Sequence, residues 1–266
     1  MLPPPHSFIS LRVGLLGTGR VASQLGPALA AAGHRIAFVW GRHVPRARAL
    51  AAQLPGAQAL TTLAAPLPPA DLYLLAVPDA AVGPLLRDTT WPAGALVAHL
   101  AGALPLAVFA AQTAVRGGVF YPLQTFSPGR AIDWRTVPLC IEAADLTAEA
   151  TLITLAGSIS EHVLPLGSAQ RLKLHVAAVF ANNFTNHLLG IADALLAEAG
   201  LPPVLLAPLV RETVDKALAN PPFAVQTGPA ARRDAPTLAA HRAALAEHPA
   251  WQALYQQLTA SIQAHL

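Results

Sequence analysis

The chain has 266 residues, of which 54% are hydrophobic and 12% charged, and its formal net charge is +3. This length is enough for one large or two ordinary domains with a substantial core. The basic residues are scattered, which argues against a nucleic-acid partner, and no apolar run is long and uninterrupted enough to span a membrane. Residues 1–6 show no signal-peptide pattern, so we expect a cytoplasmic protein. The single cysteine, Cys140, cannot form an intrachain disulfide and lies in an apolar run, which predicts a buried strand residue.

The N-terminal part begins with a pattern that is typical of dinucleotide-binding domains. A predicted strand over residues 12–16 leads into a glycine-rich turn, which is followed by a helical pattern over 21–32 and a second predicted strand over 34–40. The turn reads Gly17-Thr18-Gly19-Arg20-Val21-Ala22. Its first glycine permits a tight turn, its second lets the backbone approach a pyrophosphate, and the small alanine lets the helix pack on its strand. We therefore predict that this turn binds a dinucleotide at the N-terminus of the helix, and a purely structural turn is the alternative.

The end of the second predicted strand indicates which dinucleotide is bound. Proteins that bind NAD usually carry an Asp or Glu there, which hydrogen bonds to the ribose hydroxyls. This chain instead reads Trp40-Gly41-Arg42-His43 and continues with Arg46 and Arg48. An arginine can form bidentate hydrogen bonds to a 2′-phosphate, so we predict NADP with Arg42 as the first contact. Arg46 and Arg48 are better explained as residues that solvate the start of a surface helix, which is also the alternative for Arg42.

Three further apolar runs, over residues 71–77, 95–102 and 118–126, are predicted strands of a parallel sheet. In open α/β sheets ligands bind beyond the carboxyl ends of the strands, so we expect the three endings at one crevice. The candidate cofactor contacts from these endings are Val77, Pro78 and Gly102. The candidate substrate contacts are His99, Tyr121 and Gln124, and each could equally be a structural residue. Asp79 is predicted to be the N-cap of the next helix.

Helical periodicity replaces the strand pattern after residue 167. Two short runs, over 138–143 and 162–166, are predicted to extend the sheet, and the predicted helices are residues 168–198, 204–218, 236–247 and 251–264. The fold class is therefore α/β, with a Rossmann-like parallel-sheet domain over 1–166 followed by an all-α domain over 167–266. Helical second domains of this kind often expose more apolar surface than one small bundle can bury, so we expect a homodimer.

A polar stripe marks the first of these helices. Arg171, His175, Asn182 and Asn186 fall within an arc of about 60° on a regular helix, and such a stripe needs solvent, another polar surface or a ligand crevice. On sequence alone an exposed or interface stripe explains it as well as a ligand site. If a carbonyl or imine is reduced there, His175 is the first candidate proton donor, the asparagines could orient the substrate, and Lys173 ranks third. The histidines and the cysteine show no metal-binding spacing, so no metal is predicted.

Several segments together resemble one protein family. They are Gly14–Ala22, Ala76–Asp79, His99–Gly102, Tyr121–Phe126, Leu174–Phe184 and Thr227–Asp234. Through these segments the chain resembles, over nearly its whole length, the predicted oxidoreductases that join a Rossmann-like domain to the domain of unknown function 2520. Those proteins look like relatives of β-hydroxyacid dehydrogenases, pyrroline-5-carboxylate reductase and ketopantoate reductase. The resemblance implies a nucleotide-binding domain followed by a helical, often dimerising domain, with a site histidine and an asparagine eight residues later, which His175 and Asn183 match.

The chain departs from that family pattern at four positions near the implied pocket. They are Leu174 where a Tyr precedes the site histidine, Tyr121 where a His precedes Pro-Leu-Gln, Ala101 where a Ser precedes Gly102, and Arg233 where a Gly precedes Asp234. The better-characterised relatives also use a helix Lys four residues before an Asn, and this pair is absent here. The resemblance therefore implies the fold and the cofactor more strongly than the catalytic residues.

We therefore predict an NADP-dependent oxidoreductase that reduces a small carbonyl or imine compound in the crevice between the two domains. A ketopantoate-like oxo acid is one candidate substrate, by analogy. The catalytic candidates are His175, Asn183 and Lys173, and Asn182 joins the substrate contacts. The alternative is a non-catalytic protein that senses the NADPH to NADP ratio. A deazaflavin in place of nicotinamide is also compatible with the sequence.

Overall fold

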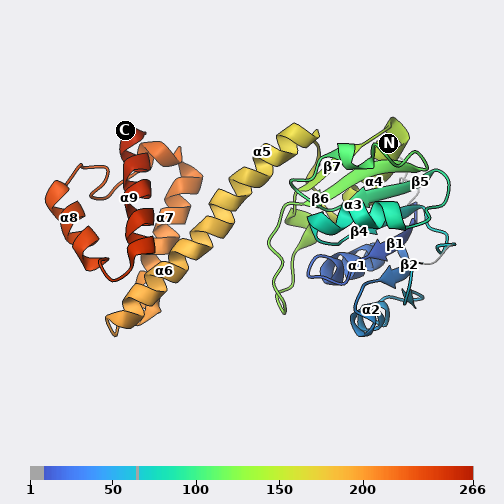
Figure 1. Ribbon diagram of the computed structural model, residues 1–266, viewed down its shortest axis with the longest axis horizontal. Coiled ribbons are helices and arrows are strands. Elements are labelled where there is room, and N and C mark those ends of the chain that lie inside the picture. The colour runs from blue at the N-terminus through green and yellow to red at the C-terminus, as the bar shows by residue number, and fades with distance from the viewer. Residues whose placement is uncertain (1–8, 64–65, 266) are drawn as a thin grey trace, which may run out of the picture. The chain divides into compact units, whose positions relative to one another are not determined.

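The computed structural model describes residues 9–63 and 66–265, and the chain forms two compact units, Met1–Asn182 and Asn183–Leu266. The first unit holds a β-sheet with helices, and the second is made of helices (Figure 1). The predicted fold class is thus confirmed. The helix that begins at Ser168 belongs with the first unit by its contacts, and the domain boundary after residue 166 stays a prediction. Residues 1–6, where the sequence shows no signal-peptide pattern, lie outside the described residues.

An eight-stranded sheet, in the order β3-β2-β1-β4-β5-β6-β7-β8, forms the centre of the first unit. Its strands are β1 (Arg12–Leu16), β2 (Arg35–Trp40), β3 (Gln58–Leu60), β4 (Leu72–Leu75), β5 (Ala95–His99), β6 (Val115–Pro122), β7 (Leu139–Ala143) and β8 (Val163–Pro165). All neighbouring strands are parallel except β6 and β7, which run antiparallel with Tyr121 opposite Cys140. A parallel pair needs a crossover connection, usually a helix. The β6–β7 connection contains only the 3-10 helix η2 (Trp134–Thr136) and returns antiparallel, so the sheet is mostly parallel rather than entirely so.

Helices cover both faces of this sheet. The helices α1 (Ala22–Ala31), α2 (Val44–Ala51) and α4 (Leu146–Ile159) pack against one face, and α3 (Asp79–Asp88) with the 3-10 helix η1 (Leu106–Phe109) packs against the other. Alternate residues of a strand point to opposite faces, so Leu15 lies in the first core and Leu16 in the second, both fully buried. The strands are therefore apolar on both faces, which explains their continuous apolar runs in the sequence.

The starts of two helices differ from the prediction. Asp79 is the first residue of α3 rather than its N-cap, because Pro78 takes the cap position and makes no side-chain hydrogen bond there. The Asp79 carboxylate instead lies in the first turn, where negative charge complements the helix dipole. The helix α4 lies outside the predicted helices, although Asp145 is a recognisable N-cap whose carboxylate accepts a hydrogen bond from the Ala148 N–H at 2.9 Å.

The long helix predicted over residues 168–198 is interrupted. It consists of α5 (Ser168–Ala178), a π-helical segment η3 (Val179–Phe184) and α6 (Thr185–Glu198). A π-turn holds more residues than an α-turn, so angles reckoned on a regular helix do not carry through η3. The expectation that Asn182 and Asn186 share the face of His175 therefore loses its basis.

The second unit contains α6 and three further helices, α7 (Ala207–Ala219), α8 (Ala235–Ala244) and α9 (Pro249–Ala264), with the 3-10 helices η4 (Pro203–Leu206) and η5 (Pro222–Val225) between them (Figure 1). Among the described residues of this unit, the only buried hydrophobic ones are Ala230 and Leu245. Within the described ranges of the whole chain, no helix has both the length and the apolar character that a membrane crossing would need.

Candidate functional site

The glycine-rich turn lies against the ends of three neighbouring strands. Gly17 follows β1, its N–H donates to the Trp40 carbonyl of β2 at 2.7 Å, and it adopts a φ of +136°. A Cβ atom at Gly17 would lie 2.0 Å from the Ala76 carbonyl oxygen beyond β4. The positive φ and this close approach both require glycine. At Gly19, by contrast, a Cβ atom would meet nothing within 4 Å, so the backbone there is open to a ligand.

A cleft of about 1170 Å³ extends from this turn along the carboxyl ends of β1, β2 and β4. Among its lining residues are six of the predicted cofactor contacts, Gly17, Thr18, Gly19, Arg42, Val77 and Pro78. Ligands of a doubly wound sheet bind at such carboxyl ends. Of the endings of residues 71–77, 95–102 and 118–126, which the sequence predicts at one crevice, the first lines this cleft and the other two do not. The open backbone at Gly19, the start of α1 and the arginines beyond β2 fit a dinucleotide whose pyrophosphate lies at the turn.

The basic wall of the cleft is larger than the sequence indicated. His43 is the N-cap of α2, where its Nδ1 accepts a hydrogen bond from the Arg46 N–H at 3.4 Å. Arg42, His43 and Arg46 all line the cleft, whereas Arg48 does not. Arg46, for which the sequence favours solvation of the helix start, thus lines the same cleft as Arg42. Both guanidinium groups could therefore hold the 2′-phosphate of NADP.

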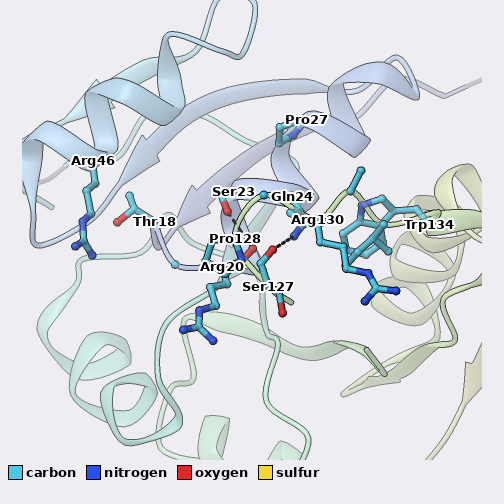
Figure 2. A pocket seen from close by; sticks show the side chains of 14 residues that line it. Thr18, Arg20, Ser23, Gln24, Pro27, Arg46, Ser127, Pro128, Arg130 and Trp134 are labelled. Carbon is cyan, nitrogen blue, oxygen red and sulfur yellow. Dashed lines mark hydrogen bonds between the residues drawn. The ribbon is translucent and has the colours of Figure 1, made fainter. Parts of the chain in front are cut away.

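A second hollow of about 600 Å³ lies beside the same turn, between α1 and residues 127–134 (Figure 2). Gln24 Nε2 donates to the Ser127 carbonyl at 3.4 Å, which links this segment to α1. Arg20 lines this hollow and not the cleft, whereas Arg46 lines both. Val21 lines neither and packs, half-buried, against the core. Of the predicted turn contacts, Thr18 and Gly19 line both hollows, Arg20 lines only the second, and Val21 lines neither.

A second group of candidate residues meets beyond the ends of β5 and β6. The Tyr121 hydroxyl and His175 Nδ1 are hydrogen bonded at 3.0 Å, and the two rings meet edge to face with centroids 5.9 Å apart. A Cβ atom at Gly102 would lie 2.5 Å from His175 Nδ1 and 2.8 Å from Tyr121 Cζ. The absence of a Cβ atom at Gly102 therefore provides the space in which the two rings meet. This role differs from the cofactor contact predicted for Gly102.

The first turn of α5 is anchored to the sheet by a buried ion pair. Arg171 is 1% exposed, and its guanidinium contacts the Glu142 carboxylate of β7 and the Leu104 carbonyl oxygen. Glu142 also accepts hydrogen bonds from Ser168, from the backbone N–H and from the hydroxyl, both at 2.9 Å. Arg171 is thus a structural part of the predicted polar stripe. Glu142 was not predicted, although an acidic residue within an apolar strand signals a buried cationic partner.

His99 lies inside the protein rather than at a surface. It is fully buried, its Nδ1 accepts a hydrogen bond from the Ala101 N–H at 3.2 Å, and its ring stacks on Phe109 with centroids 5.8 Å apart. Burial, assisted by the positive charge of Arg171, lowers the pKa of His99 to about 4. His99 Nε2 is buried without a hydrogen-bond partner among the described residues, and the substrate contact of His99 stays a prediction.

The remaining predicted residues are exposed. Gln124 accepts a hydrogen bond from the Thr125 N–H at 2.8 Å through its own side-chain oxygen. Lys173 lies on α5, Asn182 lies in η3, and Asn183 is the first residue of the second unit. In the described parts of the chain, no group of three or more His, Cys, Asp or Glu residues could hold a metal ion.

The register of the sheet relates the Tyr121–His175 pair to the cleft. Leu75 of β4 pairs with His99 of β5, and His99 pairs with Val119 of β6. Val77, which lines the cleft, and Tyr121 each lie two residues beyond this level. Neighbouring strands are about 4.8 Å apart, so two strand spacings place these residues about 10 Å apart. The pair is therefore close to the cofactor cleft within the first unit.

Comparison with known proteins gives the family of the chain. Residues 6–124 match the Rossmann-like domain family and residues 137–262 match the domain of unknown function DUF2520. A proposed NADP oxidoreductase from Bacteroides fragilis has 38% sequence identity and a TM-score of 0.88, covering 96% of this chain and 98% of its own. The chain therefore belongs to the family of oxidoreductases that join a Rossmann-like domain to DUF2520. The predicted resemblance to the Rossmann-like and DUF2520 oxidoreductases is confirmed.

More distant structures share the fold of this DUF2520 family member. A reductive aminase from Aspergillus terreus, in complex with NADPH and ethyl-5-oxohexanoate, has 17% identity and a TM-score of 0.71, covering 97% of this chain and 99% of its own. A 1-pyrroline-5-carboxylate reductase from Streptococcus pyogenes has 13% identity and a TM-score of 0.60, covering 96% and 99%. No curated protein matches the chain in sequence.

Removing the charge of Glu142 should destabilise the first unit. Glu142→Gln leaves the Arg171 guanidinium buried without a counter-charge, and breaking a buried pair in this way costs about 3–5 kcal/mol. We expect a loss of about 3 kcal/mol in the free energy of unfolding, measured by urea titration. The control is Glu161→Gln, because Glu161 pairs with Arg135 at the surface, where both side chains are more than 60% exposed, and it should cost less than about 1 kcal/mol. Equal losses would contradict the anchoring role.

Proposed function

We propose that the protein is an NADPH-dependent reductase of a small carbonyl or imine compound. The observation that carries this proposal is that one compact unit combines the cleft of the glycine-rich turn, with Arg42 and Arg46 on its wall, and the hydrogen-bonded pair Tyr121–His175 nearby. The family relationship to a proposed NADP oxidoreductase supports both the cofactor and the reaction class.

The chemistry requires little from the protein besides orientation and a proton. Bound NADPH supplies a hydride to the substrate carbon, and the carbonyl oxygen or imine nitrogen must be protonated. Imidazole groups exchange protons near neutral pH, and His175 is half-buried, so it can face both a substrate and solvent. We propose His175 as the proton donor, with Asn182 and Asn183 orienting the substrate and Lys173 as the weaker candidate.

The substrate is proposed at the level of a chemical class. The sequence suggested an oxo acid similar to ketopantoate, and the solved structures of similar fold include reductive aminases and a pyrroline-5-carboxylate reductase, whose names point to imines. A sensor of the NADPH to NADP ratio is the alternative, but a sensor has no need for a proton donor beside its cleft. The enzyme is therefore the stronger proposal. A cytoplasmic location remains a prediction of the sequence.

The decisive experiment is a turnover assay that follows NADPH oxidation with two probes, the cyclic imine 2-methyl-1-pyrroline and the oxo acid ketopantoate. We expect oxidation with one of the two classes, and loss of turnover with retained NADPH binding in His175→Ala, because the variant lacks the proton donor but keeps the cleft. Tight NADPH binding without turnover of either probe, together with a cofactor-dependent change of shape, would instead establish a sensor.

The two arginines should determine the preference for NADPH over NADH. We expect Arg42→Ala and Arg46→Ala each to weaken NADPH binding by about 1–3 kcal/mol, because each loses a charged hydrogen bond to the 2′-phosphate. NADH lacks that phosphate, so its affinity should hardly change in either variant. Calorimetric titration measures both affinities. Arg48→Ala is the matched control, because Arg48 lies on α2 with Arg46 but does not line the cleft. Equal losses of affinity for NADPH and NADH in the Arg42 and Arg46 variants would refute the assignment.

We further propose that the protein is a homodimer through its helical unit. Large apolar side chains of this unit are widely exposed, among them Val204 at 70%, Leu209 at 62%, Leu218 at 83% and Phe223 at 67%. An apolar surface of this extent is typical of a protein interface. A second copy of the chain would offer the same apolar residues, as a two-fold symmetric interface requires.

Light scattering coupled to size-exclusion chromatography tests the dimer. We expect the mass of two chains for the unaltered protein, and a shift toward the mass of one chain for Leu209→Glu, because a carboxylate in an apolar interface must be desolvated. Arg211→Glu on the same helix is the control, since Arg211 is an exposed polar residue. A single-chain mass for the unaltered protein at all concentrations would exclude the dimer.

A further inference from the structure

The contact between Tyr121 and His175 is specific in its atoms. The hydroxyl meets Nδ1 of the ring, and not Nε2, at 3.0 Å. The two rings pack edge to face with an interplanar angle of 76°. Gly102 has no Cβ atom, and this leaves the space that the contact needs. Tyr121 is 9% exposed, whereas His175 is half-buried, so the histidine is the more accessible partner.

We propose that Tyr121 is a positioning residue for His175: its hydroxyl occupies Nδ1, and this leaves Nε2 as the ring nitrogen that donates hydrogen to the substrate. The inference rests on the proposed reductase function and adds to it the atom that acts and the group that selects that atom. Tyr121, predicted from the sequence to contact the substrate, would then act through His175 instead.

The neutral ring favours this arrangement. A neutral imidazole carries hydrogen on one nitrogen and accepts a hydrogen bond at the other. If Nδ1 donated to the phenol oxygen, the phenolic O–H would need another acceptor in a buried place, and a buried donor without a partner is unfavourable. The Tyr121 O–H therefore donates to Nδ1, and the hydrogen of the neutral ring lies on Nε2.

The protonated ring keeps the same outward nitrogen. Both nitrogens of an imidazolium carry hydrogen, so in this state Nδ1–H donates to the Tyr121 oxygen, and the phenolic O–H gives up the acceptor that the neutral ring offers. During reduction the Nε2–H bond breaks as a new O–H or N–H bond forms on the substrate, and His175 is left neutral with its hydrogen on Nδ1. Solvent can return the proton to Nε2, because the ring is half-buried.

The surroundings keep the phenol in its neutral form. Burial raises the pKa of Tyr121 to about 12, and the facing groups that act on it are Cys140 from β7, Asp79 from α3 and Arg171 from α5. The first two act in the same direction as burial, and Arg171 opposes them. A phenol that keeps its proton across the neutral range can serve both states of the histidine, which a phenylalanine cannot.

Kinetics of Tyr121→Phe provide the first test. The variant keeps the packed ring and removes the hydroxyl, so NADPH affinity and KM should be unchanged. We expect kcat to fall by about 10- to 100-fold, the loss typical when the group that orients a functional histidine is removed. Tyr73→Phe is the matched control, because Tyr73 is also a buried tyrosine, whose hydroxyl donates to the Pro68 carbonyl at 3.2 Å away from this pair. It should leave kcat unchanged.

Nitrogen NMR of isotope-labelled, ligand-free protein provides a readout that needs no turnover. The His175 signal is assigned by its loss in His175→Gln. We expect the neutral ring of the unaltered protein to carry its hydrogen on Nε2 alone, and the ring of Tyr121→Phe to be a mixture of the two tautomers. Gly102→Ala provides a second disturbance of the pair, because its Cβ would displace the His175 ring. Gly157→Ala is its control, since a Cβ there meets nothing within 4 Å.

The outcomes separate this inference from the function on which it rests. A reduced kcat together with mixed tautomers in Tyr121→Phe supports the positioning role. If the unaltered protein turns over a probe and Tyr121→Phe stays within about twofold of its kcat, or if the tautomer does not change, the positioning role is overturned and the reductase stands. If the unaltered protein oxidises NADPH with neither probe, the reductase fails, and the donation from Nε2 fails with it.

Discussion

The buried ion pair between Arg171 and Glu142 is the interaction on which the arrangement of the site depends. It joins α5 to β7, and through the Leu104 carbonyl it also holds the chain beyond β5. Residues four apart lie on one face of a helix, so anchoring Arg171 directs His175 toward the same side of α5. The pair thus does more than stabilise the fold. It determines which turn of the helix meets Tyr121.

Backbone geometry shapes the cofactor cleft, whereas side-chain contacts hold Tyr121 and His175 together. The backbone of Gly17 packs closely against the Ala76 carbonyl, and the cleft opens at Gly19, where a Cβ atom would meet nothing within 4 Å. Tyr121 and His175 instead depend on a hydrogen bond and on the room left by Gly102. Because Val77 lines the cleft and lies level with Tyr121, two strands away in the sheet, the two groups lie near each other within one unit. A hydride donor in the cleft and a proton donor beside it are what a reductase needs.

The sequence predicted best those features whose causes are local. The strand over residues 12–16, the glycine-rich turn and the strand endings at Arg42 and Pro78 follow from patterns within a few residues, and the structure has them at one cleft. It could not show that Arg171 pairs with Glu142, 29 residues earlier, or that His175 meets Tyr121, 54 residues earlier. Such pairs depend on the packing of α5 on the sheet. The same holds for the stacking of His99 on Phe109, because its position at a strand end does not show the residue that covers its ring.

The π-helical segment η3 explains why helix periodicity misleads beyond Ala178. A wider turn weakens the regular hydrogen bonding of a helix, and π-turns are found frequently at functional sites. Here the segment contains Asn182 and Asn183, the two asparagines proposed to orient the substrate, and it follows directly on the helix that carries His175. A regular α-helix would have set the asparagines by the 3.6-residue repeat that also sets His175. The wider turn ends that repeat after Ala178, so the sequence spacing from His175 does not give the direction of the two asparagines.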